Sequence, residues 1–264
     1  MIKTIGLIGC GNMGGALLGG LVKNFSADYS FLAYTRTVSR LEPYLNLGVE
    51  LCFSAQEVAA KSDLVIIAVK PGQVSAILNQ IAPDLTEGKI LLSVAAGISI
   101  AAMRSQGVNC PIVRSMPDTP ALVGKGVFAL AFDGVAPESK AKIFELFSRL
   151  GLCLEMAEEK IPAFSALIGA GPAYVFAMMQ AFVQAGVTLG FGHKEARSMV
   201  EALFEGSAVM AKESPEHLMA LRDQVLSPAG LTIAGTNTLD RAGMTGILVD
   251  CVLAAYKRGQ EMEG

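Results

Sequence analysis

The fold of the first half is decided by the stretch Ile5-Gly6-Leu7-Ile8-Gly9-Cys10-Gly11-Asn12-Met13-Gly14. An apolar run leads into a G-x-G-x-x-G turn, and a helical pattern follows it, which is typical of the first unit of a dinucleotide-binding fold. Gly9 is expected to allow the tight turn, Gly11 to let a pyrophosphate approach the backbone, and Gly14 to let the helix pack against the strand. The helix N-terminus then offers free N–H groups to phosphate. The alternative, a glycine-rich turn without a ligand, is disfavoured because the motif lies between a strand and a helix.

Short apolar runs alternate with helical patterns over the first 155 or so residues. This alternation predicts an α/β fold with a parallel sheet and right-handed crossovers. A continuous apolar run, as in Leu64–Val69, is typical of a strand that is covered on both faces. Helices are expected at Met13–Lys23, Val74–Ile81 and Glu138–Leu150, and strands at Thr4–Ile8, Tyr29–Tyr34, Leu64–Val69, Ile90–Val94, Ile112–Arg114, Val127–Phe132 and Leu152–Met156.

The pattern changes after Glu158-Glu159-Lys160, and the remainder reads as helix with breaks near residues 190–193, 213–215 and 227–228. We therefore expect two domains, a Rossmann-type dinucleotide-binding domain at residues 1–158 and an all-α domain at residues 159–264. The helical part is unusually apolar, which indicates that it buries surface against a second copy of the chain.

Bulk composition excludes several classes of protein. The chain of 264 residues is 52% hydrophobic and 17% charged, with a net charge of −3, so nothing points to nucleic acid. Five scattered cysteines and two histidines predict reduced thiols in a cytoplasmic protein and no metal site. The stretch Ile161–Gly192 has no charged residue and is long enough to span a membrane, but its prolines and glycines and the lack of flanking positive charge favour a buried helix in an oligomer.

The second strand is expected to select the cofactor. Its end reads Tyr34-Thr35-Arg36-Thr37 and carries no carboxylate to hold the ribose 2′-hydroxyl of NAD. An arginine and two hydroxyls, from Thr35, Arg36 and Thr37, suit a 2′-phosphate instead, which predicts NADP. The alternative is that Arg36 is an ordinary surface arginine.

Further motifs follow the expected strands or lie in the helical half. They are Ala68-Val69-Lys70-Pro71, Ser93-Val94-Ala95-Ala96-Gly97-Ile98, Val113 to Ala121 (VRSMPDTPA), Gly169 to Phe176 (GAGPAYVF) and Leu221 to Ile233 (LRDQVLSPAGLTI). In this order and spacing, the series resembles the pyrroline-5-carboxylate reductases over essentially the full chain.

The resemblance implies an oxidoreductase that reduces 1-pyrroline-5-carboxylate to L-proline, the last step of proline biosynthesis, by hydride transfer from NADPH, with NADH possible. It also implies that the helical domain forms interlocked homodimers, often assembled further. The implied substrate-binding residues are Ser227, Gly230, Leu231 and Glu158, with Thr232 hydrogen-bonded to the ring nitrogen as the catalytic residue. The implied cofactor-binding residues are Gly9, Gly11, Asn12, Met13, Ala68, Val69, Lys70, Pro71, Ala95, Ala96 and Gly97.

The segment Ser227–Thr232 suits a small anionic substrate because a helix is expected to begin near Thr232. Its unpaired N–H groups and positive dipole end can hold a carboxylate without a buried arginine. A hydroxyl at Thr232 can donate to an imine or accept from an iminium. The alternative is an ordinary helix-capping threonine.

Some positions depart from the family pattern. Asp118 stands where the family usually has Asn, Ala229 where it has Gly, and Leu231 where it has a smaller residue. If position 229 needs a positive φ, alanine is strained there. Two other functions therefore stay open, a reductase of a different cyclic imine such as a six-membered ring, and an NADP-binding regulatory relative that has lost turnover.

Overall fold

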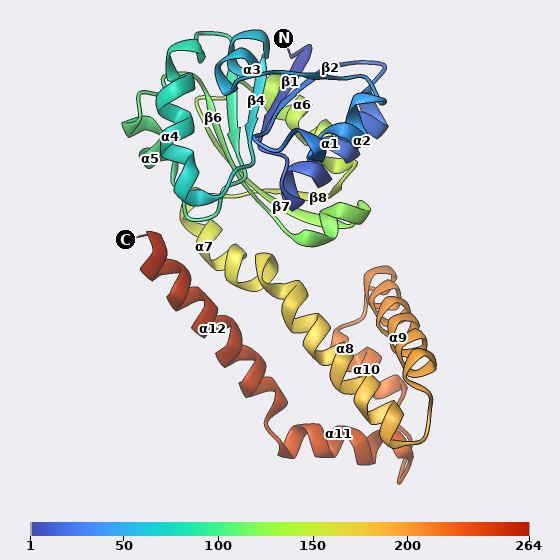
Figure 1. Ribbon diagram of the computed structural model, residues 1–264. Coiled ribbons are helices and arrows are strands. Elements are labelled where there is room, and N and C mark those ends of the chain that lie inside the picture. Colours follow the sequence, from blue (N-terminus) through green and yellow to red (C-terminus); the bar gives the residue numbers. More distant parts are fainter. Residues whose placement is uncertain (1, 264) are drawn as a thin grey trace. The chain divides into compact units, whose positions relative to one another are not determined.

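A single twisted sheet organises the first half of the molecule (Figure 1), seen in a computed structural model that describes residues 2–263. Its eight strands follow the order β3-β2-β1-β4-β5-β6-β7-β8. Neighbouring strands are parallel except for β6 and β7, which are antiparallel. The strands are β1 (Thr4–Ile8), β2 (Ser30–Tyr34), β3 (Val49–Leu51), β4 (Leu64–Ile67), β5 (Ile90–Ser93), β6 (Ile112–Pro117), β7 (Gly126–Asp133) and β8 (Gly151–Glu155).

The sheet differs from the sequence prediction in two places. The prediction of a parallel sheet is wrong at β6 and β7, because only the short 3₁₀ helix η3 (Thr119–Val123) joins them. A parallel pair needs a crossover of a dozen or more residues, whereas an antiparallel pair does not. The edge strand β3 was also missed, because Val-Glu-Leu is too short to show a periodic pattern.

Helices cover both faces of the sheet (Figure 1), as the run Leu64–Val69 predicted. The side chains of Leu64 and Ile66 join a core that includes residues of α1 (Asn12–Phe25) and α6 (Pro137–Ser148). The alternate residues Val65 and Ile67 join a second core on the other face. That core includes residues of α3 (Ala55–Lys61), α4 (Pro71–Ile81) and α5 (Ile100–Ser105). Burial of each large apolar side chain contributes roughly 1.5–3 kcal/mol, so the two cores hold this half together.

The described residues after Lys160 form helices and no strand, as expected. These are α7 (Ile161–Phe164), the π-helical turn η5 (Ser165–Gly169), α8 (Gly171–Thr188), α9 (His193–Glu213), α10 (Leu218–Gln224), α11 (Leu231–Arg241) and α12 (Met244–Glu263). Short elements of the first half are η1 (Val38–Arg40), α2 (Glu42–Leu45), η2 (Ala82–Asp84) and η4 (Glu158–Lys160).

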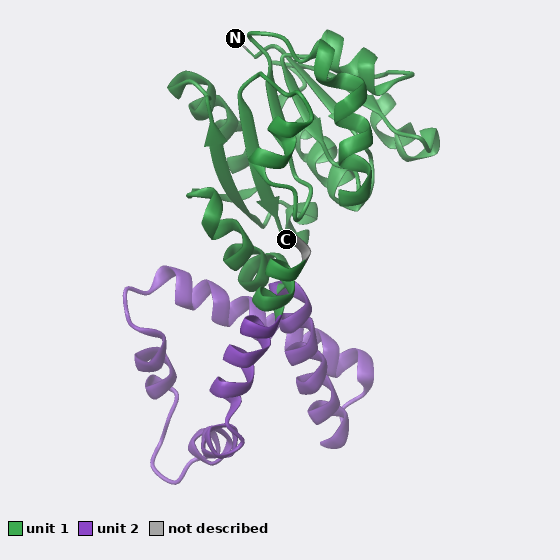
Figure 2. Ribbon diagram, turned by 90° about the vertical axis from the view of Figure 1, so that its left-hand side faces the viewer, with its two compact units in different colours: residues 1–170, 255–264 green, residues 171–254 purple. Residues whose placement is uncertain are grey.

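Two compact units divide the chain (Figure 2). Unit 1 comprises Met1–Ala170 and Ala255–Gly264, and unit 2 comprises Gly171–Ala254. The division therefore falls after the position near residue 159 that the sequence suggested. The reason is packing, because Ile161 and Phe164 of α7 are buried in one cluster with Ala129 and Ala131 of β7.

Unit 2 buries little of its own apolar surface. Its buried cluster consists of Val183, Ala196 and Val200, whereas many of its large apolar side chains are exposed, such as Phe176 and Ile247. The helical stretch Glu158–Thr188 is long and apolar enough to cross a membrane, by length and composition only. Surface of this kind is typical of a protein interface as well.

Candidate functional site

The turn after β1 forms a cradle that only glycines permit. Gly9 has a φ of +99°, and a Cβ there would lie 2.8 Å from the carbonyl oxygen of Ala68. A Cβ at Gly14 would collide with the carbonyl oxygen of Gly9. Around Gly11, in contrast, the nearest atom to an added Cβ is Nη1 of Arg40 at 3.9 Å. Protein atoms therefore leave no room for a side chain at Gly9 and Gly14. The space around Gly11 is open, and a pyrophosphate would approach the backbone there.

Three further predicted segments reach the same edge of the sheet. The amide of Gly9 donates to Tyr34 O (2.8 Å), which ties the turn to Thr35, Arg36 and Thr37 after β2. The amide of Ala68 donates to Ile8 O (2.8 Å), and Val94 N donates to Ile67 O (3.0 Å), just before Ala95, Ala96 and Gly97. Strand order reverses between β1 and β4, and ligands of open α/β sheets bind at such a point. The structure thus brings together the cofactor-binding residues that the sequence suggested.

Local structure explains the conformation of two of these segments. Lys70 is the N-cap of α4, with Pro71 as its first residue, and the exposed Lys70 side chain extends from the helix start. Gly97 has a φ of +70°, which allows the chain to turn from β5 towards α5.

Two arginines stand near the cradle. Arg36 is exposed, and its guanidinium lies against the side-chain amide of Gln73, whose oxygen accepts from Nη1 at 3.2 Å in the amide orientation that satisfies both groups. Arg40, which the sequence did not assign to the site, ends η1, and its carbonyl oxygen accepts from Cys10 Sγ at 3.5 Å. A second arginine four residues after Arg36, in Arg-Thr-Val-Ser-Arg, was the sequence signal that could have assigned Arg40 to the site.

Positive charge dominates the cavity that opens at the cradle. The cavity measures about 790 Å³ and is lined by Gly11, Asn12 and the basic residues Lys23, Arg40 and Arg149, with no carboxylate among its lining residues. The first turn of α1 carries no acidic residue, and no side chain caps it. The open glycine, the free helix N-terminus and the basic side chains fit a dinucleotide phosphate, and Arg36 fits an additional 2′-phosphate.

In the loop before α11, the backbone at position 229 has the positive φ that strains an alanine. Ala229 has a φ of +58° and is the only non-glycine residue with a positive φ among residues 2–263. Gly230 donates its amide to Ser227 O (3.0 Å), and a Cβ at Gly230 would collide with Ser227 Oγ. A tight turn therefore delivers the chain to the start of α11 at Leu231.

The N-terminus of α11 can receive an anion. Its N-cap is Gly230, so no side chain satisfies the first amides, and its first turn has no acidic residue. Leu231 is 95% exposed, and Thr232 is half-buried. The expected helix start near Thr232 is confirmed, and its free N–H groups and dipole suit a carboxylate.

The carboxylates of two acidic residues accept hydrogen bonds from other groups of the protein. Asp118 is buried, and its Oδ1 accepts from Val127 N at 2.9 Å. Burial raises the pKa of Asp118, although the backbone hydrogen bonds oppose this. Glu158 Oε1 accepts from Ile100 N (2.7 Å) and from Arg114 Nη1 (2.9 Å). Glu158 therefore holds protein groups, and the place near the substrate that the family resemblance suggested stays a prediction.

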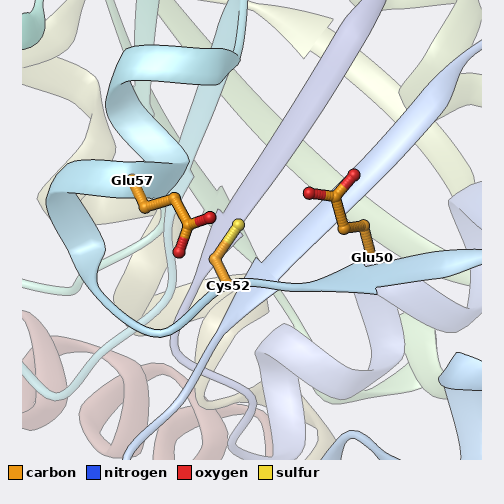
Figure 3. Close-up of side chains that lie close together, drawn as sticks. All are labelled: Glu50, Cys52 and Glu57. Carbon is orange, nitrogen blue, oxygen red and sulfur yellow. The ribbon is translucent and has the colours of Figure 1, made fainter.

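One group of side chains has the composition of a metal site. Glu50, Cys52 and Glu57 each place one ligand atom within 4.8 Å of the others (Figure 3). However, Lys61 Nζ bonds to Glu50 at 2.9 Å and to Glu57 at 2.8 Å, so both carboxylates already share one ammonium as their cation. Burial, and secondarily the charge of Glu57, raises the pKa of the Cys52 thiol to about 11, which disfavours the thiolate that a metal needs.

Comparison with known proteins identifies relatives over the whole chain. Residues 158–262 match the model of the pyrroline-5-carboxylate reductase dimerisation domain, and residues 4–97 match that of NADP oxidoreductase, coenzyme F420-dependent. The pyrroline-5-carboxylate reductase of Escherichia coli (strain K12) is 33% identical over 266 residues, which cover 99% of each chain.

Solved structures agree with the sequence relatives. A pyrroline-5-carboxylate reductase from Coxiella burnetii superposes with a TM-score of 0.93 at 28% identity and covers 100% of each chain. The Plasmodium falciparum pyrroline carboxylate reductase with NADP bound has a TM-score of 0.88 at 28% identity, covering 100% of this chain and 98% of that one. The chain therefore belongs to the pyrroline-5-carboxylate reductase family.

Proposed function

We propose that this protein reduces 1-pyrroline-5-carboxylate to L-proline with NADPH. The observation that carries this proposal is the combination, in one chain, of an open dinucleotide cradle at Gly9–Gly14 and an uncapped helix N-terminus after Gly230. The first suits a phosphate-rich cofactor and the second a small carboxylate. Relatives named pyrroline-5-carboxylate reductase match the chain along nearly its full length.

The residues at the carboxyl edge of the sheet would hold the cofactor. Gly9, Gly11, Asn12 and Met13 would bind the pyrophosphate, and Thr35, Arg36 and Thr37 the 2′-phosphate. The segments Ala68, Val69, Lys70, Pro71 and Ala95, Ala96, Gly97 would flank the nicotinamide half. NADPH, when bound, supplies a hydride from C4 of its nicotinamide ring.

The loop before α11 would hold the substrate. Ser227, Gly230 and Leu231 bind the carboxylate, with the free amides of the first helical turn as donors. Thr232 hydrogen-bonds to the ring nitrogen, donating to the imine or accepting from the iminium. Because a protonated imine is already electrophilic, the main task of these residues is to orient it.

The proposal extends to organisation and location. Residues 1–158 act as the dinucleotide-binding domain, and residues 159–264 as the dimerisation and substrate domain, through which copies of the chain form a homo-oligomer. The exposed apolar residues of unit 2 support this role, since an interface with another copy of the chain would bury them. The match to a dimerisation domain favours a protein interface over a membrane. We propose that the enzyme is cytoplasmic and binds neither nucleic acid nor a membrane.

The test is NADPH oxidation, followed by loss of nicotinamide absorbance, with pyrroline-5-carboxylate. The six-membered analogue and NADH serve as comparisons. We expect fast turnover on the five-membered ring with NADPH, and slower turnover with either substitute. Preference for the six-membered ring would refute the substrate assignment, and NADPH binding without turnover on either ring would indicate a regulatory protein.

A further inference from the structure

Glu158 joins three parts of unit 1 at one carboxylate oxygen. Its Oε1 accepts from Ile100 N at 2.7 Å and from Arg114 Nη1 at 2.9 Å, and Glu158 itself begins η4. Ile100 is the first residue of α5, and Arg114 lies in the middle of β6. The family model of the dimerisation domain also begins at residue 158.

The bond to Ile100 fixes the end of the segment proposed to flank the nicotinamide. The amide of Ile100 is one of the first-turn donors that have no partner within a helix. Ser99 Oγ satisfies Ala102 N at 3.0 Å, and the Glu158 carboxylate satisfies Ile100 N. Since Gly97 is a left-handed residue between β5 and this helix start, an anchor at Ile100 limits where Ala96 and Gly97 can lie.

The bond to Arg114 anchors the carboxylate itself. The Arg114 side chain is only 4% exposed and that of Glu158 27%, so solvent screens their pairing weakly. Arg114 pairs in register with Ser93, the last residue of β5. Arg114, Ala96 and Gly97 also line one cavity of about 270 Å³, together with Ile161 of α7 and Ser165 of η5.

We infer that Glu158 is a positioning residue, which holds the segment Ala95–Ser99 in place for hydride transfer through Ile100 and Arg114 and does not bind the substrate. This inference rests on the proposed function of that segment beside the nicotinamide. A shift of the segment changes the distance over which the hydride moves, whereas it leaves the phosphate cradle intact. Misplacement of reacting groups by about 1 Å can slow a reaction about a hundredfold.

The experiment compares Glu158→Gln and Glu158→Ala with the control Glu159→Gln in the full-length oligomer. Glu159 is exposed and adjacent, and removal of its charge alters the local field in a similar way. The Glu158→Gln side chain would keep an acceptor for Ile100 N but lose its ion pair with Arg114, so this variant should have an intermediate effect. The measurements are kcat and KM for pyrroline-5-carboxylate, the dissociation constant of NADPH by fluorescence, and the isotope effect with NADPH deuterated at C4.

We expect Glu158→Ala to lower kcat by about ten- to a hundredfold and to raise the isotope effect on kcat, with both KM and the NADPH dissociation constant within about threefold of the wild type. Amide exchange of a peptide covering residues 94–105 should become faster, and Glu159→Gln should leave every value unchanged. A large rise in KM with kcat unchanged would instead place Glu158 on the substrate and overturn the inference. Equal effects of the two glutamine variants would overturn it as well.

The exchange measurement separates this inference from the proposed function. If the wild type binds NADPH but does not turn over pyrroline-5-carboxylate, the proposed function fails. Faster exchange of residues 94–105 in Glu158→Ala would still support the anchor, and unchanged exchange would refute it.

Discussion

The two units of this molecule bury their apolar residues to very different extents. Unit 1 has two large cores, one on each face of its sheet, and a smaller third cluster, whereas unit 2 has a single small buried cluster around Val183, Ala196 and Val200 among its described residues. Large apolar side chains of unit 2, such as Phe176 at 63% exposure, face outwards in the single chain. The comparison teaches that unit 1 is stabilised by its own contacts, while the exposed apolar surface of unit 2 suits an interface with another copy of the chain.

The largest expected effect tests this difference with a matched pair of exposed phenylalanines. Phe176→Asp in unit 2 should dissociate the oligomer and abolish activity, because assembly would bury the new charge without a partner. Phe53→Asp in unit 1, where Phe53 is 83% exposed, should change neither. Light scattering after size-exclusion chromatography measures the mass of each variant. If both variants keep the mass of the wild type, Phe176 lies outside the interface.

A substitution at the start of α11, where we propose that the substrate binds, should affect turnover alone. Thr232→Ala removes the hydroxyl proposed to bind the ring nitrogen, so kcat should fall about a hundredfold or more. The affinity for NADPH should stay within about twofold, because the phosphate cradle lies in unit 1. Thr238→Ala, farther along α11, serves as the control. Unchanged kcat in Thr232→Ala would remove this residue from the mechanism.

A substitution in unit 1 should show the reverse pattern and affect cofactor affinity. Arg36→Ala should weaken NADPH binding by about tenfold or more, since a charge-assisted bond to the 2′-phosphate is lost. Binding of NADH, which has no 2′-phosphate, should change little. Lys142→Ala, which removes an exposed cation of α6 away from this cavity, is the control and should leave both affinities unchanged. Equal losses for NADPH and NADH in Arg36→Ala would contradict the proposed 2′-phosphate contact.

A smaller and pH-dependent effect is expected at Asp118. Burial raises its pKa in the folded state, so the protonated form is favoured, and the stability that this form contributes at low pH is lost as the pH rises through the folded pKa. Asp118→Asn avoids that loss and can keep the bond from Val127 N. The variant should therefore raise Tm at pH 7 by about 3 °C and by less near pH 4. The exposed Asp28→Asn is the control, and an equal gain at both pH values would speak against the burial effect.

The smallest effect is expected at the strained Ala229. Glycine removes the cost of left-handed alanine, about 1 kcal/mol, but adds conformational entropy to the unfolded chain. Ala229→Gly should therefore stabilise by less than about 1 kcal/mol. Ala234→Gly, within α11, should destabilise by about 1 kcal/mol. Chemical denaturation measures both, and destabilisation by Ala229→Gly would show that the loop does not strain the alanine.

Local patterns in the sequence determine much of the local structure in both units. The Gly9–Gly14 turn, the strand at Leu64 and the helix start near Thr232 were predictable because each depends on a few adjacent residues with strong backbone or burial preferences. The same holds for the alternation of strand and helix up to β8. The antiparallel β7 and the edge strand β3 were not predictable, because strand direction depends on the connection and short strands carry little pattern.

Only the tertiary structure decided the contacts between segments that are distant in the sequence. The hydrogen bonds that join Glu158 to Ile100 and Arg114 could not be predicted from the sequence, because these residues lie far apart in the chain. Arg40 lies beside Gly11, and its carbonyl oxygen accepts from Cys10 Sγ, a contact that the arginine repeat in the sequence does not specify. The sequence alone therefore determined most of the elements and the cofactor that they suit, because local preferences and motifs carry that information. The partners of each side chain, and the point at which the compact units divide, depend on packing across the sequence and became known only from the folded chain.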